Sequence, residues 1–271
     1  MTATTVSPAP VASAALTAPT RQPPVLPNLL RSEWAKVRSV RSTYWSLAAA
    51  VAAMIGYGAI NSAPHAGAGH GASDPILTSL SGVLLAQLAI AVLGVLVITT
   101  EYSTGMIRST FAAAPQRHLV IVAKAGVLGA AAFAVGTVAS LIAFLGGQAI
   151  MGANGVSLTA PGALRSVIGI GLYLGLLGVF AVALGTIIRR STGAIAALVG
   201  LILVLPALLL TLPASLQDTI VKFLPGNAGQ AIFTTGQDTS TLSPWAGLAV
   251  FALYAAAALA LALVLLRRRD A

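Results

Sequence analysis

The chain has 271 residues, of which 57% are hydrophobic and only 8% are charged. An ordinary soluble domain carries roughly 25% charged residues, so this composition excludes a soluble fold and indicates a polytopic membrane protein. The formal net charge of +9 fits a nucleic-acid or anionic-lipid partner, and the placement of the charges must decide between them. The absence of cysteine excludes disulfides, thiolate metal sites and cysteine nucleophiles.

The first 27 residues are rich in Ala, Thr, Ser and Pro, and their prolines recur too often for a long helix. No basic stretch precedes an apolar core, so we do not expect a secretory signal peptide. We predict a disordered cytoplasmic tail over residues 1–27.

Residues 28–42, NLLRSEWAKVRSVRS, predict a separate amphipathic helix. Leu30, Trp34 and Val37 recur at helical spacing, and the basic residues occupy mostly other faces. A basic helix with one apolar stripe and a tryptophan is typical of a segment that lies in the membrane interface. The alternative is a simple positive flank that orients the first span.

Six apolar segments follow, and each reaches or nearly reaches the roughly 20 residues that a helix needs to cross a bilayer. Their predicted boundaries are about 43–61, 76–100, 119–150, 166–188, 192–212 and 245–266. The sequence therefore predicts an all-α polytopic membrane protein, with a six-helix transmembrane domain over residues 43–268. Pro206 lies inside the fifth segment and should kink or break it.

Basic residues are concentrated on one side of this layout. The other side holds only Arg165 and Lys222 among the 15 lysines and arginines. By the positive-inside rule, both termini are expected in the cytoplasm, so the charge is mainly an orientation signal and no nucleic-acid partner is expected. The thirteen residues on the cytoplasmic side are Arg21, Arg31, Lys36, Arg38, Arg41, Arg108, Arg117, Lys124, Arg189, Arg190, Arg267, Arg268 and Arg269.

The connection between the fifth and sixth spans, residues 213–243, is unusual. It contains two apolar pieces, SLQDTIVKFL and AGQAIF, around a PGN turn. Leu216, Ile220 and Phe223 recur at helical spacing in the first piece. Two short pieces that dip into the outer membrane surface fit this pattern, and so does a plain structured loop.

Polar chemistry inside the spans is sparse. No Asp, Glu or His lies within a span, whereas ion-coupled carriers usually keep such groups there. No GxxxxGK[ST] phosphate loop and no helical histidine pair occur, so we expect neither an enzyme nor a metal site in this chain. Neutral polar residues of the spans either join helices or line a substrate path, and the candidates for that path are Tyr57, Gln87, Thr137, Ser140 and Tyr173.

The segment EYSTGMIRSTFAAAPQR, residues 101–117, is a polar connection between the second and third spans. Gly105 permits a bend and Pro115 forces a stop, so about two helical turns are predicted between them. Arg108 is placed to pair with Glu101. A short helix here suits docking of another protein, and a tight connector that rests on lipid head groups is the alternative. Its predicted apolar stripe comprises Met106, Ile107, Thr110, Phe111 and Ala114.

The pattern Glu-Tyr-x-x-Gly-x-Ile-Arg, followed by AAPQR and by Lys124 in the next helix, resembles the ABC-2 type permeases of bacterial ABC transporters. The run SEWAKVRSVRSTYW before the first span resembles their interfacial elbow helix. The six-span layout and the position of LPGNAGQAIF also match, so that the resemblance covers about residues 28–268.

This resemblance implies a permease subunit in the bacterial cell membrane that pairs as a homo- or heterodimer. It would bind two cytoplasmic ABC ATPase subunits, which would hold ATP and Mg, while this chain would hold no cofactor. Most members export, so export is the expected direction. The implied coupling helix comprises Gly105, Met106, Ile107, Arg108, Ser109, Thr110 and Phe111, and the implied supporting residues are Glu101, Tyr102, Pro115, Arg117 and Lys124.

Two other functions stay open. The same fold could serve a non-transporting membrane component, such as an immunity, sensor or assembly protein. An ion-coupled carrier is the least favoured, because the spans lack acidic residues.

Overall fold

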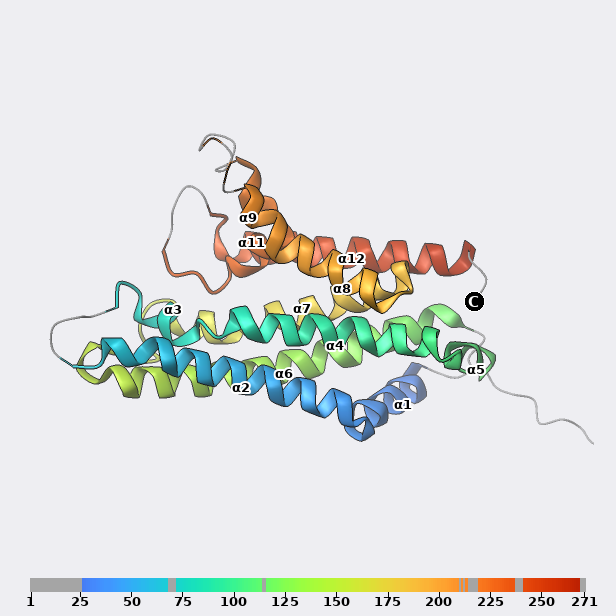
Figure 1. Cartoon of the computed structure of the whole chain (residues 1–271), viewed down its shortest axis with the longest axis horizontal. Coiled ribbons are helices and arrows are strands. Elements are labelled where there is room, and N and C mark those ends of the chain that lie inside the picture. Colours follow the sequence, from blue (N-terminus) through green and yellow to red (C-terminus); the bar gives the residue numbers. More distant parts are fainter. Residues whose placement is uncertain are drawn as a thin grey trace, which may run out of the picture.

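The computed structural model describes residues 26–67, 72–113, 116–209, 211, 213, 219–236 and 241–268. It is 85% helical, and the described residues contain no strand. Six of its helices are long and apolar enough to span a membrane (Figure 1). The prediction of an all-α polytopic membrane protein is confirmed. Most of the predicted tail and Pro115 lie outside the described residues.

The helices follow the order of the predicted elements. The six membrane-spanning candidates are Arg41–His65, Pro75–Ser103, Arg117–Asn154, Ala163–Ile188, Ser191–Leu209 and Pro244–Arg268, and each overlaps one predicted apolar segment. The individual elements are α1 (Leu26–Ser39), α2 (Arg41–Ser62), η1 (Ala63–His65), α3 (Pro75–Leu80), α4 (Val83–Ser103), α5 (Met106–Ala113), α6 (Arg117–Met151), η2 (Gly152–Asn154), α7 (Ala163–Ile188), α8 (Ser191–Val199), the π-helix η3 (Gly200–Val204), α9 (Leu205–Leu209), η4 (Val221–Phe223), α11 (Pro225–Gln230) and α12 (Pro244–Arg268).

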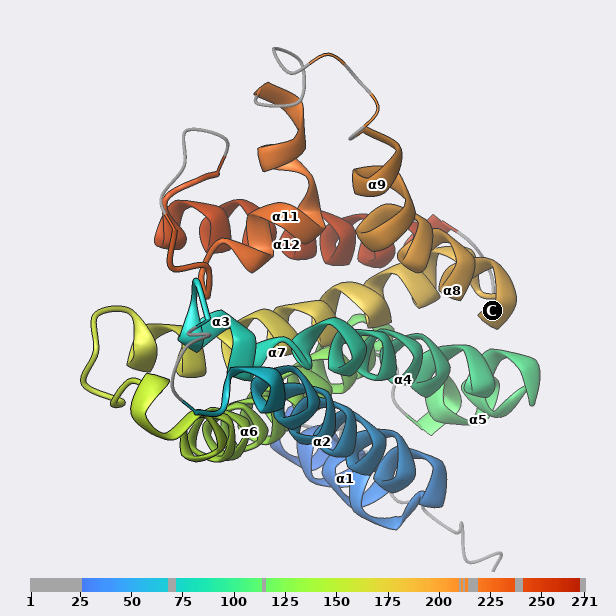
Figure 2. The same cartoon turned by 60° about the vertical axis from the view of Figure 1, so that its left-hand side comes forward.

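The helices α2, α4, α6 and α7 form one bundle, and α12 packs on α7 (Figure 2). Small residues set the spacing in this bundle, since a Cβ atom added to Gly94 of α4 would lie 2.5 Å from the Cβ of Ala181 on α7. Close approach of backbones provides the dispersion contacts that hold helices together where lipid removes the usual hydrophobic drive.

The fifth span is irregular at its centre, as Pro206 predicts. The amide of Leu205 donates to the carbonyl of Gly200, which is the wide π-type bond. Pro206 has no amide hydrogen, and its ring clashes with the carbonyl of Ile202, four residues earlier. The Ile202 oxygen therefore lacks the α-helical hydrogen bond that the amide of residue 206 would otherwise donate. Gly226 of α11 packs against this carbonyl, because a Cβ atom there would lie 2.9 Å from the Ile202 oxygen.

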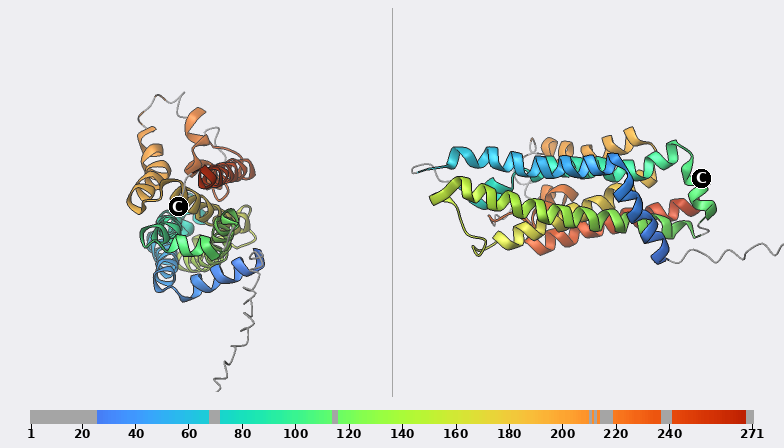
Figure 3. Two further views of the ribbon diagram at one scale, coloured as in Figure 1. Left: turned by 90° about the vertical axis from the view of Figure 1, so that its right-hand side faces the viewer. Right: turned by 90° about the horizontal axis from the view of Figure 1, so that it is seen from below.

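The helix α1 lies across the bundle rather than along it (Figure 3). It is separated from α2 by Val40, whose backbone is extended. Its inward face carries Leu29 and Glu33, whereas Leu30 and Trp34 of the predicted apolar stripe are 37% and 47% exposed. Leu30 and Trp34 therefore lie on an exposed face, which is the arrangement expected when lipid surrounds the helix, whereas Val37 of the same stripe is half-buried.

The second apolar piece of residues 213–243 is packed into the fold as α11 and the turn after it. Ile232 and Phe233 are buried, and Ser166 of α7 donates a hydrogen bond to the carbonyl of Phe233 at 2.9 Å. Arg165 donates to the carbonyl of Thr234 at 3.0 Å. Part of the first piece, residues 215–218, lies outside the described residues.

Candidate functional site

One end of the bundle collects α1, α5, the start of α6, the connection between α7 and α8 and the last turn of α12 (Figure 1). We call it the basic end. Buried apolar side chains of α1, α5, α6 and α12 pack together in one core at this end. Its described basic residues are Arg31, Lys36, Arg38, Arg41, Arg108, Arg117, Lys124, Arg189, Arg190, Arg267 and Arg268.

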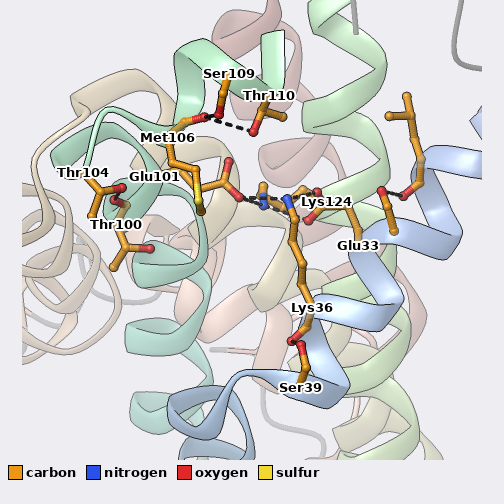
Figure 4. A network of polar contacts seen from close by, with 12 residues as sticks. Glu33, Lys36, Ser39, Thr100, Glu101, Thr104, Met106, Ser109, Thr110 and Lys124 are labelled. Atoms are coloured by element: carbon orange, nitrogen blue, oxygen red, sulfur yellow. Dashed lines mark hydrogen bonds and ion pairs between the residues drawn. The ribbon is translucent and has the colours of Figure 1, made fainter. Parts of the chain in front are cut away.

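Four charged side chains meet at this end, and we call them the charge cluster: Glu33 and Lys36 of α1, Glu101 of α4 and Lys124 of α6 (Figure 4). The Lys124 ammonium donates to Glu33 Oε2 and to Glu101 Oε1, at 2.8 Å each. The Lys36 ammonium donates to Glu33 Oε1 at 2.6 Å and to Glu101 Oε1 at 3.1 Å. Three helices far apart in the sequence are thereby joined.

Most of the charge cluster is shielded from solvent. The side chains of Lys124, Glu101 and Glu33 are 2%, 4% and 6% exposed, and that of Lys36 is 38% exposed. Charges are tolerated in such surroundings only when they are paired and hydrogen-bonded. Two carboxylates and two ammonium groups give a cluster without net charge, which meets this condition.

The charge cluster shifts the pKa of Lys36, which lies on α1 outside the spanning segments. Burial by itself lowers the pKa of this ammonium, but the hydrogen bond and charge of Glu33 and the charge of Glu101 outweigh burial. The pKa of Lys36 is therefore raised above its ordinary value. Lys36 stays charged at every physiological pH.

The predicted pairing of Glu101 with Arg108 is wrong. Glu101 binds Lys36 and Lys124 instead, and Arg108 is exposed with no carboxylate within ion-pair distance in the described part of the chain. The reason is the bend at Gly105, where φ is +71°, which carries α5 away from the axis of α4. A residue with a side chain rarely adopts this backbone conformation, so glycine is required at the bend.

One face of the helix α5 packs against the bundle, and we call it the seated face. The other face is exposed. Ile107 and Phe111 are buried, and they pack with a core that includes Ile121 of α6. The guanidinium of Arg117 lies 5.5 Å from the centre of the Phe111 ring, at a distance typical of a cation–π contact. Met106 of the predicted apolar stripe is 50% exposed and Thr110 is half-buried, while Ala114 lies outside the described residues.

Tyr102 connects the end of α4 to the next turn of the basic end. The Arg189 guanidinium lies 5.2 Å from the centre of the Tyr102 ring. Arg189 ends α7 in the left-handed conformation, with φ at 62°, and its amide donates to the carbonyl of Gly185 at 2.8 Å. The connection between α7 and α8 therefore lies beside the α4–α5 joint.

The candidate path residues do not gather in one place. Gln87 and Tyr173 meet in the core, where the Tyr173 hydroxyl donates to Gln87 Oε1 at 2.6 Å. Ser140 donates to the carbonyl of Val167 at 2.8 Å and so joins α6 to α7. Tyr57 is 38% exposed on α2. The hydroxyl of Thr137 donates to the carbonyl one turn earlier in α6.

Glu33 and Lys36 are the site residues that the sequence did not single out. Glu33 is the only acid in a strongly basic segment, and this was the available signal. Its partner could not be identified, because Glu33 and Lys124 are 91 positions apart. The described residues contain no group of three His, Asp or Glu side chains that could hold a metal ion.

Comparison with known proteins gives one family. No curated protein sequence matches the chain. The profile of a family described as "ABC-2 family transporter protein" matches residues 29–207, which include most of α1, the charge cluster and α5. This match covers well over half of the chain, and the fold of six apolar helices agrees with it. The chain belongs to the ABC-2 transporter family and is the permease component of an ABC transporter.

Proposed function

We propose that this permease component exports its substrate with energy from a separate cytoplasmic ABC ATPase, and that α5 is the helix on which the ATPase docks. The observation that carries this proposal is the two-faced character of α5. Ile107 and Phe111 fix one face to the bundle, while Met106, Arg108 and Ser109 are exposed on the other. A face that is exposed beside a firmly seated one is available for a partner.

When α5 moves, the charge cluster would transmit the movement to the spanning helices. Glu101 lies in the last turn of α4, which leads into the bend before α5, and its carboxylate accepts a hydrogen bond from Lys124 of α6. Glu33 binds the same ammonium from α1. A force on α5 would therefore reach three helices through short ionic contacts rather than through the flexible bend alone.

ATP binding in the partner shifts the permease between two arrangements only by binding one of them more tightly. The glycine and alanine contacts between α4, α6 and α7 suit such a change, because small side chains do not lock neighbouring helices by interdigitation. A second permease copy or a paralogue would complete the transport path. The concentration of arginine and lysine supports a cytoplasmic position for the basic end.

The test is the double variant Arg108→Glu with Ala112→Glu, which reverses one charge, adds a second negative charge and alters only the exposed face of α5. We expect the purified variant to lose co-purification with a co-expressed ABC ATPase partner, and to lose substrate-stimulated ATP hydrolysis in proteoliposomes. The matched control is Arg268→Glu at the end of α12, which is also exposed. It should retain both activities.

A second variant, Phe111→Ala, tests the seated face. It removes a buried side chain beside Arg117 without changing the exposed surface, so the ATPase should still bind while stimulation by substrate falls. Unimpaired ATPase binding and stimulation in the Arg108→Glu, Ala112→Glu variant would overturn the assignment of α5. ATP-dependent movement of substrate toward the basic end would overturn export.

A further inference from the structure

The helices α2 and α4 separate toward the basic end. Far from it, they touch through backbone, since a Cβ atom added to Gly82 would lie 2.6 Å from the Cα of Met54. Toward α1 the two ribbons diverge (Figures 1 and 2). A cavity of about 460 Å³ opens there, which falls within the range of small-molecule sites in proteins.

The walls of this cavity are mostly apolar. One wall is formed by Val37 of α1 and by Val40 of the bend that follows α1. The opposite wall is formed by Leu93, Leu96 and Val97 of α4. The charge cluster closes one end, and its charges cancel, so that end does not attract a free ion. Exposed lining residues mark the rim, and they include Val40, Ser42, Thr100 and Met106.

Aromatic side chains place the cavity at the surface of the membrane. Tyr44 and Trp45, in the first turn of α2, are 67% and 69% exposed. Their rings are 6.0 Å apart in an edge-to-face arrangement. Exposed tyrosine and tryptophan at the end of a spanning helix are typical of the level of the lipid head groups. Thr43 and Ser46, which neighbour them in the chain, line the cavity.

Two positive charges remain uncompensated beside the rim. Arg38 and Arg41 flank the lining residue Val40, and both are exposed. Neither has a carboxylate within ion-pair distance among the residues that the structure describes, since the two nearby acids are occupied by Lys36 and Lys124. Guanidinium groups bind phosphate with two parallel hydrogen bonds, and they prefer it to uncharged polar groups.

We propose that this cavity binds one anionic phospholipid from the leaflet at the basic end. One acyl chain lies between the valines of α1 and the leucine and valine side chains of α4. The head-group phosphate lies at the rim, where Arg38 and Arg41 neutralise it. Only a molecule that has both an apolar chain and a phosphate would contact the apolar walls and the two arginines at the same time. The site borders the exposed face of α5 only at Met106, which lines its rim, and lipid binding is measurable without the ATPase.

The experiment uses native mass spectrometry of the full chain after purification in mild detergent with added phosphatidylglycerol. We expect one retained phosphatidylglycerol per chain, and much weaker retention of phosphatidylcholine with the same acyl chains. Leu96→Trp places a bulky ring where the acyl chain would lie and should abolish retention. Its matched control is Leu253→Trp on α12, where the native side chain is 70% exposed, and this variant should retain the lipid.

The arginines are tested by the double change Arg38→Gln with Arg41→Gln. Each basic residue near a membrane surface contributes about 1 kcal/mol to binding of anionic lipid, so we expect roughly thirtyfold weaker retention of phosphatidylglycerol. Arg267→Gln with Arg268→Gln removes the same charge at the end of α12 and should change it little. Inorganic phosphate should not displace the lipid, because it has no acyl chain that could contact the apolar walls of the cavity.

Circular dichroism and size-exclusion chromatography report whether Leu96→Trp folds. If it does not, a phosphatidylglycerol with a diazirine near the end of one acyl chain replaces it as the test in the unmodified protein. Cross-links on the peptide that contains Leu93, Leu96 and Val97 are expected. Cross-links confined to α12, or equal retention by Leu96→Trp and Leu253→Trp, would overturn the proposal, and so would displacement by inorganic phosphate.

Discussion

The ammonium nitrogen of Lys124 on α6 lies 2.8 Å from Oε1 of Glu101 on α4, and both side chains are almost fully buried. The second carboxylate oxygen of Glu101 is buried and accepts no hydrogen bond from the described residues. The stability of the Glu101 charge therefore depends on Lys124 and Lys36. Because Glu101 lies in the last turn of α4, just before the bend into α5, the same contact would serve both the fold and the proposed coupling.

Removal of Lys124 should destabilise the protein strongly. Lys124→Met keeps the length of the side chain but leaves two buried carboxylates with Lys36 alone, and loss of one partner of a buried pair costs about 3–5 kcal/mol in free energy of unfolding. Unfolding by SDS titration in mixed micelles measures this change. The double variant Lys124→Met with Glu101→Gln should recover most of the loss, since a neutral cluster remains. Equal stability of Lys124→Met and the unmodified protein would contradict the pairing.

Lys36 gives a dependence on alkaline pH. Its pKa in the folded protein is raised, so its contribution to stability is fully present below the unfolded value of about 10.4 and is lost as pH rises through the folded value. The melting temperature in detergent should therefore decline above about pH 10.4 because of this residue. Lys36→Arg stays charged there and should show a smaller decline. Identical pH profiles of the two proteins would show that Lys36 is not stabilised by its carboxylates.

Gly82 is a point of backbone contact between α2 and α4. A methyl group in Gly82→Ala would meet the Cα atom of Met54 at 2.6 Å, so the helices must move apart. Overpacking of this kind costs about 1–3 kcal/mol. Gly146→Ala on α6 is the control, because no atom lies within 4 Å of the added methyl group. Thermal unfolding should rank Gly82→Ala below Gly146→Ala, and the reverse order would contradict the contact.

The hydrogen bond between Tyr173 and Gln87 joins α7 to α4 in the core. Tyr173→Phe removes the donor and keeps the ring packing, so we expect a loss of about 0.6–1.7 kcal/mol in free energy of unfolding, as for other bonds between membrane helices. Gln87→Leu combined with Tyr173→Phe should lose less than the two single changes together. Strictly additive losses, measured by SDS titration, would show that the two side chains do not interact.

Much of the architecture follows from local properties of the sequence. The apolar segments predicted six spanning helices, because a helix that crosses a bilayer must satisfy its backbone internally over roughly 20 residues. Pro206 predicted the irregular fifth span, and Gly105 predicted the bend before α5, since each residue imposes its backbone constraint without help from neighbours.

The partners of charged residues were not predictable in this way. Arg108 was the predicted partner of Glu101, because it lies close by in the sequence. The structure instead selects Lys36 and Lys124, which are 65 and 23 positions away. Similarly, the apolar stripe of α1 was visible, but only the packing shows that its opposite face, with Glu33, meets the bundle.

The sequence by itself determined the number of spanning helices, their class and the break points, because these depend on hydrophobic length and on single glycine and proline residues. Only the tertiary structure decided which helices meet, which charges neutralise each other and where α2 and α4 leave a cavity. Those features depend on contacts between residues far apart in the chain. Spacing along a helix specifies which face a side chain occupies, but not what lies opposite that face.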